Sequence, residues 1–284
     1  MSEVVIVGSG PAGISTALYT ARGGLATTVI SRGSGALGKT DKIQNYYGFS
    51  DVISGEELEQ NGIEGARKLG VRFVEAEAVS LGFADRLLVE TTEGSYSADF
   101  VVLATGTQRK TVPIPGRKEL EGKGVSYCAV CDAFFYRQKP VAVFGNGEYA
   151  LHEAEALLPV AASVTLFTDG QPVSAAFPEE IRIEEGKIRK IRGAERVEAV
   201  CMEDGREIPV DGIFLAYGTA GGSDLAKKLG ARTEENRVVV DERMRTSIPG
   251  LYSVGDCNGG MLQIAKAVYE GAVAGTDIVK TSRR

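Results

Sequence analysis

Two cysteines separated by two residues form the most reactive pair in this sequence. Cys128 and Cys131 make a Cys-x-x-Cys motif, and Asp132 follows at once. A dithiol with this spacing can close into a small disulfide ring, in which one sulfur resolves a mixed disulfide formed on the other. In a cytosolic chain, such a motif near a βαβ pattern indicates redox chemistry. The motif therefore predicts a redox-active dithiol.

Two other uses of the pair remain open at this point, namely half of a zinc site and a pair without redox activity. A structural zinc ion needs four nitrogen or sulfur ligands, usually supplied as two close pairs. Cys201 and Cys257 stand alone, and the chain has a single histidine. We therefore expect no metal site and rank both alternatives below a redox dithiol.

The composition is that of a globular α/β enzyme. The chain has 284 residues, 36 of them glycine, and 25% of its residues are charged. This length favours two domains, and the glycine content predicts many tight turns. No apolar run is long enough for a membrane span and no signal peptide is recognised, so we expect a cytoplasmic protein without a membrane partner. The net charge of −6, with both signs interspersed, argues against nucleic acid as a partner.

The N-terminal residues match a dinucleotide-binding βαβ unit. A β-branched run at 4–7 predicts a strand, a helical stretch continues to about Arg22, and a second strand is expected at 27–31. The turn between the first strand and the helix has the spacing G-x-G-x-x-G and consists of Gly8, Ser9, Gly10, Pro11, Ala12 and Gly13. Such glycines permit the tight turn and the close approach of a pyrophosphate, which the free amides of the helix N-terminus bind.

One position departs from this fingerprint. An acidic residue that binds a ribose hydroxyl is expected at the end of the second strand. The sequence has Ser31 and Arg32 there. The serine hydroxyl can still bond the ribose, so the prediction of nucleotide binding stands.

A second unit of the same kind begins near residue 140. The run 141–144 predicts a buried strand, and the turn at 145–150 has the spacing G-x-G-x-x-A. The next strand is expected at 163–167. Further strands are predicted at 100–106, 212–218 and 250–256, the last followed by a helix at about 263–279, with crossings between domains at 112–115 and 236–244.

In this order, these motifs resemble the low-molecular-weight thioredoxin reductases, over nearly the whole chain. The block YCAVCDAFFYR at 127–137 is the most specific feature. The other matching segments are GSGPAG at 8–13, IQNYYGF at 43–49, LATGT at 103–107 and TSIPGLYSVGDC at 246–257. The family fold is α/β and three-layered, with two Rossmann-like domains, the second inserted in the first. This implies an FAD domain at 1–112 and 241–284, and a pyridine-nucleotide-type domain at 113–240 that carries the Cys-x-x-Cys.

The resemblance also implies which residues bind FAD. The diphosphate is expected on the turn at 8–13, and Asn45 near the flavin. The adenosine region and the ribitol are assigned to Ala104, Thr105, Gly106, Gly255 and Asp256. The pyrimidine edge of the flavin is assigned to Gln263, Ile264 and Ala265, where the family usually has Arg-Gln-Ala. Gln263 in place of arginine removes a positive charge from that edge.

For the chemistry, the resemblance implies that Cys131 faces the flavin and that Cys128 attacks the disulfide of a protein substrate, for which thioredoxin is expected. Asp132 matches the family's acid/base carboxylate, and a homodimer is expected. A different class of function stays open, a flavin-binding electron-transfer or regulatory module without a disulfide substrate. The intact Cys128, Cys131 and Asp132 argue against it.

The electron donor is where the family pattern fails. NADPH-dependent members carry a His-Arg-Arg-like cluster for the 2′-phosphate, whereas this chain has Asp169 and no arginine before Arg182. Asp169 would repel a phosphate but could accept from a free ribose hydroxyl, which favours NADH over NADPH. Tyr149 also stands where the family commonly has a small residue. We expect a ferredoxin-like donor first, then NADH, then NADPH.

A ferredoxin is usually acidic, so a basic docking surface is expected. The stretch 187–192, which reads KIRKIR, is one candidate, although a solvated strand face explains it more simply. The FAD domain also contributes Arg32, Lys39 and Lys42.

Overall fold

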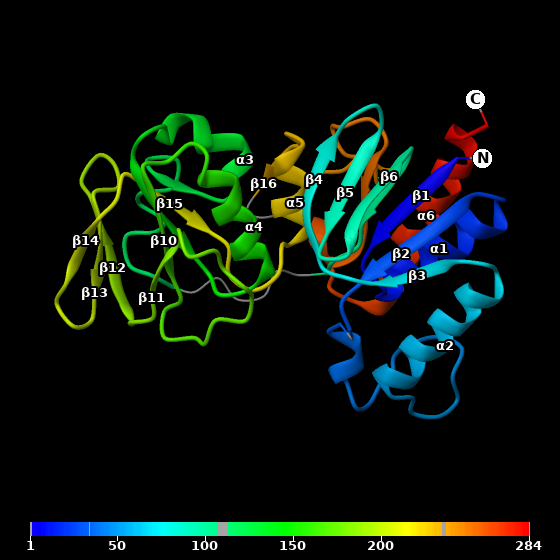
Figure 1. The fold of residues 1–284 in the computed structure, drawn as a ribbon. Helices are drawn as coiled ribbons and strands as arrows, with labels where there is room; N and C mark the ends of the chain where they lie inside the picture. The colour runs from blue at the N-terminus through cyan, green and yellow to red at the C-terminus, as the bar shows by residue number, and fades with distance from the viewer. Residues whose placement is uncertain (1, 34, 107–112, 235–236, 284) are drawn as a thin grey trace. The chain divides into compact units, whose positions relative to one another are not determined.

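The structure is a computed structural model that describes residues 2–33, 35–106, 113–234 and 237–283. The expectations that fall on 107–112 and 235–236, including the domain end at Val112, lie outside these residues. The chain divides into two compact units (Figure 1), unit 1 formed by Met1–Gln108 with Gly221–Arg284, and unit 2 formed by Arg109–Ala220. The parallel sheets described below confirm the predicted α/β fold with two Rossmann-like units.

Unit 1 contains a five-stranded parallel sheet of order β18-β7-β1-β2-β3. Its strands are β1 (Glu3–Val7), β2 (Ala26–Ser31), β3 (Arg72–Glu75), β7 (Phe100–Leu103) and β18 (Leu251–Ser253). Helices α1 (Pro11–Arg22) and α6 (Ile264–Thr281) lie together against this sheet, as Figure 1 shows. Two glycines of α6 permit the close approach, since a Cβ on Gly271 would lie 2.3 Å from the Ala12 carbonyl oxygen, and one on Gly275 2.6 Å from the Tyr19 Cβ.

An antiparallel sheet of order β4-β5-β6 and further short elements complete unit 1. They are 3-10 helix η1 (Leu37–Lys39), α2 (Gly55–Lys68), β4 (Ala78–Phe83), β5 (Leu87–Thr91), β6 (Gly94–Ala98), α5 (Gly222–Lys228), β16 (Thr233–Glu234), β17 (Arg237–Val238) and 3-10 helix η3 (Gly255–Asn258). Buried side chains from the parallel sheet, α1 and α6 form one core, with Ile6 and Ile278 fully buried.

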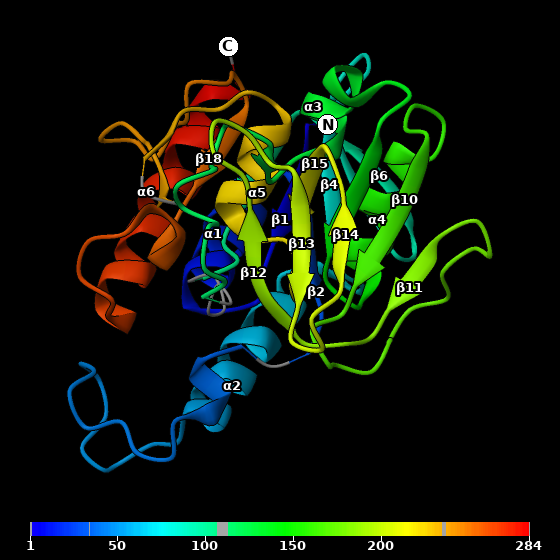
Figure 2. The ribbon, with the colours of Figure 1, turned by 90° about the vertical axis from the view of Figure 1, so that its left-hand side faces the viewer.

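Unit 2 repeats the design with a five-stranded parallel sheet of order β11-β10-β9-β15-β8. A three-stranded antiparallel sheet, β12-β13-β14, shares its core (Figure 2). The elements are β8 (Val125–Ser126), α3 (Ala129–Asp132), 3-10 helix η2 (Ala133–Tyr136), β9 (Pro140–Phe144), α4 (Glu148–Leu157), β10 (Ser163–Phe167), β11 (Arg182–Glu184), β12 (Ile188–Arg192), β13 (Ala199–Met202), β14 (Glu207–Pro209) and β15 (Gly212–Leu215).

The chain returns to unit 1 after Ala220, which is earlier than the expected boundary after residue 240. Helix α5 packs on β4 and on β17, so the segment after Ala220 already belongs to unit 1. No motif marks this boundary, since α5 is short and lacks a glycine-turn motif. Among the helices of the described residues, none is long and apolar enough to cross a membrane.

Candidate active site

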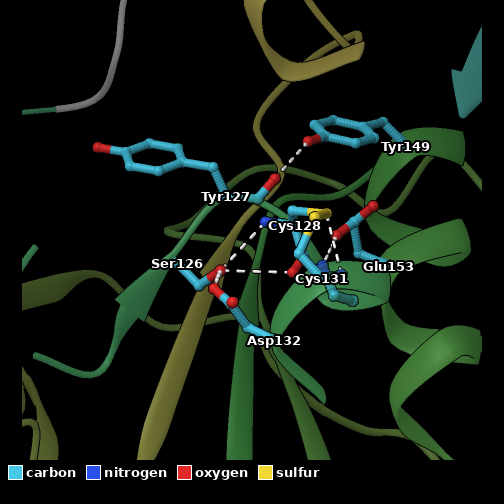
Figure 3. The surroundings of a disulfide bond; sticks show 8 residues. Ser126, Tyr127, Cys128, Cys131, Asp132, Tyr149 and Glu153 are labelled. Atoms are coloured by element: carbon cyan, nitrogen blue, oxygen red, sulfur yellow. Dashed lines mark hydrogen bonds between the residues drawn. A yellow bond between two sulfur atoms is a disulfide. The ribbon is translucent and has the colours of Figure 1, made fainter. Parts of the chain in front are cut away.

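The two cysteines of the motif form a disulfide in unit 2, with their Cα atoms 5.3 Å apart (Figure 3). Cys128 is the N-cap of α3, and its sulfur accepts a hydrogen bond of 3.1 Å from the Cys131 amide. An amide directed at a sulfur stabilises the thiolate that forms there on reduction. The observed disulfide fits the redox interpretation of the motif rather than the zinc interpretation, because its sulfurs are bonded to each other.

Asp132 is held beside this disulfide by a serine that the sequence analysis did not single out. The Ser126 hydroxyl donates a 2.6 Å hydrogen bond to Asp132 Oδ2 and accepts one of 3.1 Å from the Cys128 amide. Ser126 ends β8, the edge strand of the parallel sheet. The strand therefore fixes both the carboxylate and the backbone of the first cysteine.

Helix α4 supplies two more contacts to the same loop. The carboxylate of Glu153 accepts a 2.5 Å hydrogen bond from the Ala129 amide, and the Tyr149 hydroxyl donates one of 3.2 Å to the Tyr127 carbonyl. Both side chains are buried, Glu153 at 0% and Tyr149 at 1% exposure. Figure 3 shows them reaching the loop from the same helix. Cys128 thus lies between two backbone groups bound by α4.

Apolar side chains are exposed next to the disulfide. Cys128 is buried and Cys131 is exposed. The exposed fractions of Val130, Phe134 and Phe135 are 60%, 75% and 68%. Large apolar groups gathered on a surface mark sites of protein or ligand contact.

The first glycine turn lies between β1 and α1, as predicted. Gly8 has φ +114°, and a Cβ there would lie 2.3 Å from the Ala104 carbonyl oxygen. A Cβ on Gly13 would lie 2.0 Å from the Gly8 carbonyl oxygen. A Cβ on Gly10, in contrast, would meet no described atom within 4 Å, and no side chain caps the α1 N-terminus. Uncapped amides beside open space fit a diphosphate.

A carboxylate does lie at the end of β2, although the sequence analysis did not find one. Glu77 is buried and forms an ion pair with Arg32, which follows Ser31. The Ala76 amide bonds to the Ser31 carbonyl at 3.1 Å, so the two segments lie side by side. In the sequence this acid follows β3, whereas the fingerprint places its acid directly after β2. A search by motif spacing would therefore not find Glu77.

The other predicted FAD residues lie in three places in unit 1. Asn45 donates a 3.2 Å hydrogen bond to the Gln263 side chain, just before α6 begins with Ile264 and Ala265. Ala104 to Gly106 follow β7. Within the described residues the buried Thr105 hydroxyl has no hydrogen-bond partner, which suits a polar ligand group.

Gly255 and Asp256 begin η3, beside a buried carboxylate. The Gly255 amide donates a 2.7 Å hydrogen bond to Glu270, and Lys266 donates one of 2.8 Å to the Gly255 carbonyl. Burial raises the pKa of Asp256 above its ordinary value, and the charge of Lys266 partly offsets this effect. A half-buried carboxyl of this kind suits a hydroxyl-bearing partner such as ribitol.

The second glycine turn has its polar groups bound by its own chain. The Asn146 side chain donates 2.8 Å to the Pro172 carbonyl, and the Ser174 amide donates 2.7 Å to the Asn146 carbonyl. Asp169 accepts a 2.8 Å hydrogen bond from the Ile188 amide. A Cβ on Gly147 would lie 3.2 Å from the Ser174 hydroxyl. The region where a nucleotide phosphate would approach is therefore lined by internal contacts.

Comparison with known proteins identifies the family. The model of the pyridine nucleotide-disulphide oxidoreductases matches residues 2–271. A thioredoxin reductase from Listeria monocytogenes is 34% identical over 98% of this chain and 93% of its own length. One from Aquifex aeolicus is 34% identical over 95% of this chain and 89% of its own length.

Solved structures agree. The atypical thioredoxin reductase TRi from Desulfovibrio vulgaris Hildenborough has a TM-score of 0.94 at 35% identity, covering 100% of this chain and 98% of that one. A ferredoxin-flavin thioredoxin reductase from Clostridium acetobutylicum has a TM-score of 0.75 at 30% identity, covering 99% and 98%. The chain therefore belongs to the pyridine nucleotide-disulphide oxidoreductase family, as an FAD-type flavoenzyme like the thioredoxin-disulfide reductases.

Proposed function

We propose that this protein reduces the disulfide of a thioredoxin-like protein through Cys128 and Cys131, with electrons from a donor other than NADPH. The observation that carries this proposal is the disulfide at the N-terminus of α3, with Asp132 fixed beside it by Ser126. Relatives named thioredoxin reductases support the choice of substrate.

The chemistry of the chain's own groups follows from this geometry. After reduction, the Cys128 thiolate, stabilised by the Cys131 amide, attacks one sulfur of the substrate disulfide and expels the other as a thiolate. The Cys131 sulfur then attacks Cys128, which restores the internal disulfide and releases the second substrate thiolate. Asp132 exchanges protons with the sulfurs and leaving thiolates. When bound, FAD supplies the two electrons that reduce the internal disulfide.

A protein rather than a small substrate is supported by the exposed aromatic pair. Phe134 and Phe135 follow the motif within four residues and are more than half exposed, with Arg137 over the Phe134 ring. Aromatic and arginine side chains are enriched at the centres of protein interfaces.

FAD binding by unit 1 is proposed on the residues assigned above. Four features fit its polar groups: the open space at Gly10, the uncapped start of α1, the half-buried Asp256 carboxyl, and the Thr105 hydroxyl, which has no hydrogen-bond partner in the described part of the chain. Glu77 joins this set as a buried carboxylate paired with Arg32, which follows β2.

A donor other than NADPH is supported by the second glycine turn. Its Asn146 is engaged by the segment around Ser174, and Asp169, at the sequence position of the 2′-phosphate clamp, accepts from the Ile188 amide. The loss of two charge-assisted contacts at roughly 1.5–3 kcal/mol each corresponds to about 10²–10⁴-fold weaker NADPH binding. We propose a ferredoxin-like iron–sulfur protein as the donor, then NADH. The name of the Clostridium relative supports the first choice.

The basic strand offers only a partial docking surface for such a donor. In β12, Ile188 and Ile191 are buried while Arg189 and Lys190 are exposed. Arg192 forms ion pairs with Glu198 and Glu207. Lys187, just before β12, is exposed as well, so of the four cations in KIRKIR it is Arg192, engaged in these ion pairs, that makes the stretch a weaker candidate than its letters indicate.

The test is anaerobic mixing of the oxidised holoenzyme with NADPH, NADH or reduced ferredoxin in separate runs, followed by flavin absorbance. We expect ferredoxin to bleach the flavin fastest. Rapid, saturable bleaching by micromolar NADPH would contradict the donor proposal. Subsequent addition of oxidised thioredoxin should restore the flavin absorbance and yield two thiols. A reduced flavoprotein that leaves thioredoxin oxidised would favour the electron-transfer module instead.

A further inference from the structure

We propose that helix α4 sets the reduction potential and the position of the Cys128–Cys131 pair, through Glu153 and Tyr149 acting as positioning residues. The inference rests on the proposed redox function of that pair. In a dinucleotide-binding unit, the N-terminus of a helix in the position of α4 faces a phosphate. The proposal assigns α4 a second role, at the disulfide.

The two contacts lie on either side of the first cysteine. Tyr149 binds the carbonyl of Tyr127, and Glu153 binds the amide of Ala129. Both partners are backbone groups of residues adjacent to Cys128, so the backbone on each side of the cysteine is held by α4. Tyr149 and Glu153 are four residues apart on α4, which places them on the same face of the helix.

The two contacts differ in their electrostatic effect. The carboxylate of Glu153 is buried and accepts from the first amide of α3, that of Ala129, which directly follows Cys128 (Figure 3). A negative charge in a buried position disfavours a second one nearby. Reduction of the disulfide takes up two electrons and creates thiolate character at Cys128, so Glu153 opposes it. The pair is therefore a stronger reductant toward a protein disulfide than it would be without Glu153.

Tyr149 carries no charge, and its effect is on position alone. Its ring is buried and its hydroxyl donates to a carbonyl that precedes the cysteine. Loss of this hydrogen bond would free the loop before Cys128 without altering the local charge. Because the two effects differ, each residue is tested by a separate measurement.

The first experiment compares the full-length holoenzyme with Glu153→Gln, which keeps the side-chain shape and the acceptor oxygen. Glu155→Gln serves as the matched control, because Glu155 lies on the same helix and is exposed. Each protein is equilibrated in glutathione buffers of known ratio, and the free thiols of Cys128 and Cys131 are alkylated and measured by mass spectrometry. We expect Glu153→Gln to shift the dithiol–disulfide equilibrium about tenfold toward the dithiol, which is about 30 mV for a two-electron couple. An equilibrium within twofold of both wild type and Glu155→Gln would overturn the electrostatic part.

The second experiment uses Tyr149→Phe, which removes only the hydroxyl. We expect amide hydrogen exchange in the peptide spanning 126–132 to become roughly fivefold faster, as for the loss of one hydrogen bond. Unchanged exchange would overturn the positional part. Neither measurement uses an electron donor or thioredoxin, so a failure here is distinct from a failure to reduce thioredoxin.

Discussion

The two glycine turns share a spacing and differ in what surrounds it. In each turn the first glycine has a positive φ and lies against the carbonyl of a neighbouring strand end, Gly8 near Ala104 and Gly145 near Ala216. At the next glycine they diverge. A Cβ on Gly10 would enter open space, whereas one on Gly147 would lie 3.2 Å from the Ser174 hydroxyl.

This difference separates the structural from the ligand-binding part of the motif. The first glycine serves the packing of helix on strand and is required in both units. The second glycine serves a ligand only where the space beyond it stays open. The presence of G-x-G-x-x-G therefore predicts the βαβ turn, and the residues that line the turn decide whether a phosphate can reach it.

The largest effect is expected from replacing either cysteine of the disulfide in unit 2. Cys128→Ser and Cys131→Ser should each abolish reduction of thioredoxin, since neither can close the internal disulfide. Cys128→Ser should leave a Cys131 thiolate against the oxidised flavin and give a long-wavelength charge-transfer band, and Cys131→Ser should not. Absorbance spectra of the two purified variants check this. A band in Cys131→Ser would reverse the assigned roles.

A smaller effect is expected from the carboxylates of the two units. Asp256→Ala should weaken FAD retention by roughly 1.5–3 kcal/mol, the value of a hydrogen bond to a charged group. Asp169→Ala is the matched change in unit 2, where the side chain accepts a hydrogen bond from the Ile188 amide. Fluorescence titration of the apoproteins with FAD measures both. Equal FAD affinity for wild type and Asp256→Ala would remove Asp256 from the site.

The glycines themselves give the next effect in size. Gly10→Ala should fold normally and bind FAD about tenfold more weakly, because its methyl group enters the space assigned to the diphosphate. Gly147→Ala should change FAD affinity by less than about twofold by the same principle. Binding titrations and circular dichroism of the two variants provide the measurement. Normal FAD binding by Gly10→Ala would show that the open space is not the diphosphate site.

The smallest effect concerns acid sensitivity of unit 1. Burial alone would raise the pKa of Asp277, but hydrogen bonds from Arg245 at 2.5 and 2.8 Å and from Tyr252 at 2.8 Å outweigh it and lower the pKa. A carboxyl group whose pKa is lowered by folding stabilises the fold at pH values above its pKa in the unfolded chain, about 3.8. This stabilisation is lost as the pH falls through the lower pKa of the folded protein.

Asp277→Asn should therefore lower the melting temperature at pH 7 by a few degrees, and the difference from wild type should shrink as the pH falls below 4. Thermal unfolding across this range tests the sign. In this variant, amide hydrogen exchange should become faster in peptides of α6 and β18 rather than in unit 2. A difference that grows in acid would contradict the assigned role of the ion pair.

Much of the fold follows from local sequence. The buried strands and the two glycine turns were predicted because apolar β-branched runs and glycine spacing are properties of adjacent residues. Helix α6 was expected at about 263–279 and lies at Ile264–Thr281. The boundary after Ala220 was missed because it depends on α5 packing on β4, a contact between residues far apart in the chain.

The candidate site shows the same limit. Cys128, Cys131 and Asp132 are contiguous and were found from their spacing. Glu153 and Glu77 were not, because each acts through a backbone amide or a cation on another element. One signal was available for Glu153, because it lies four residues from both Tyr149 and Leu157, on an otherwise apolar face of α4, and a charged residue on such a face indicates a buried partner.

The interruption of unit 1 has a consequence for how the protein is made. When the ribosome has synthesised residue 220, unit 2 is complete, while unit 1 still lacks β18, which pairs with β7, and α6, which packs on α1. Until then β7 has an open edge, and Asp256 and Gln263 do not yet exist in the nascent chain. With the FAD residues proposed above, the redox loop would fold during translation before a flavin could be held, and FAD uptake would follow at the final stage of synthesis.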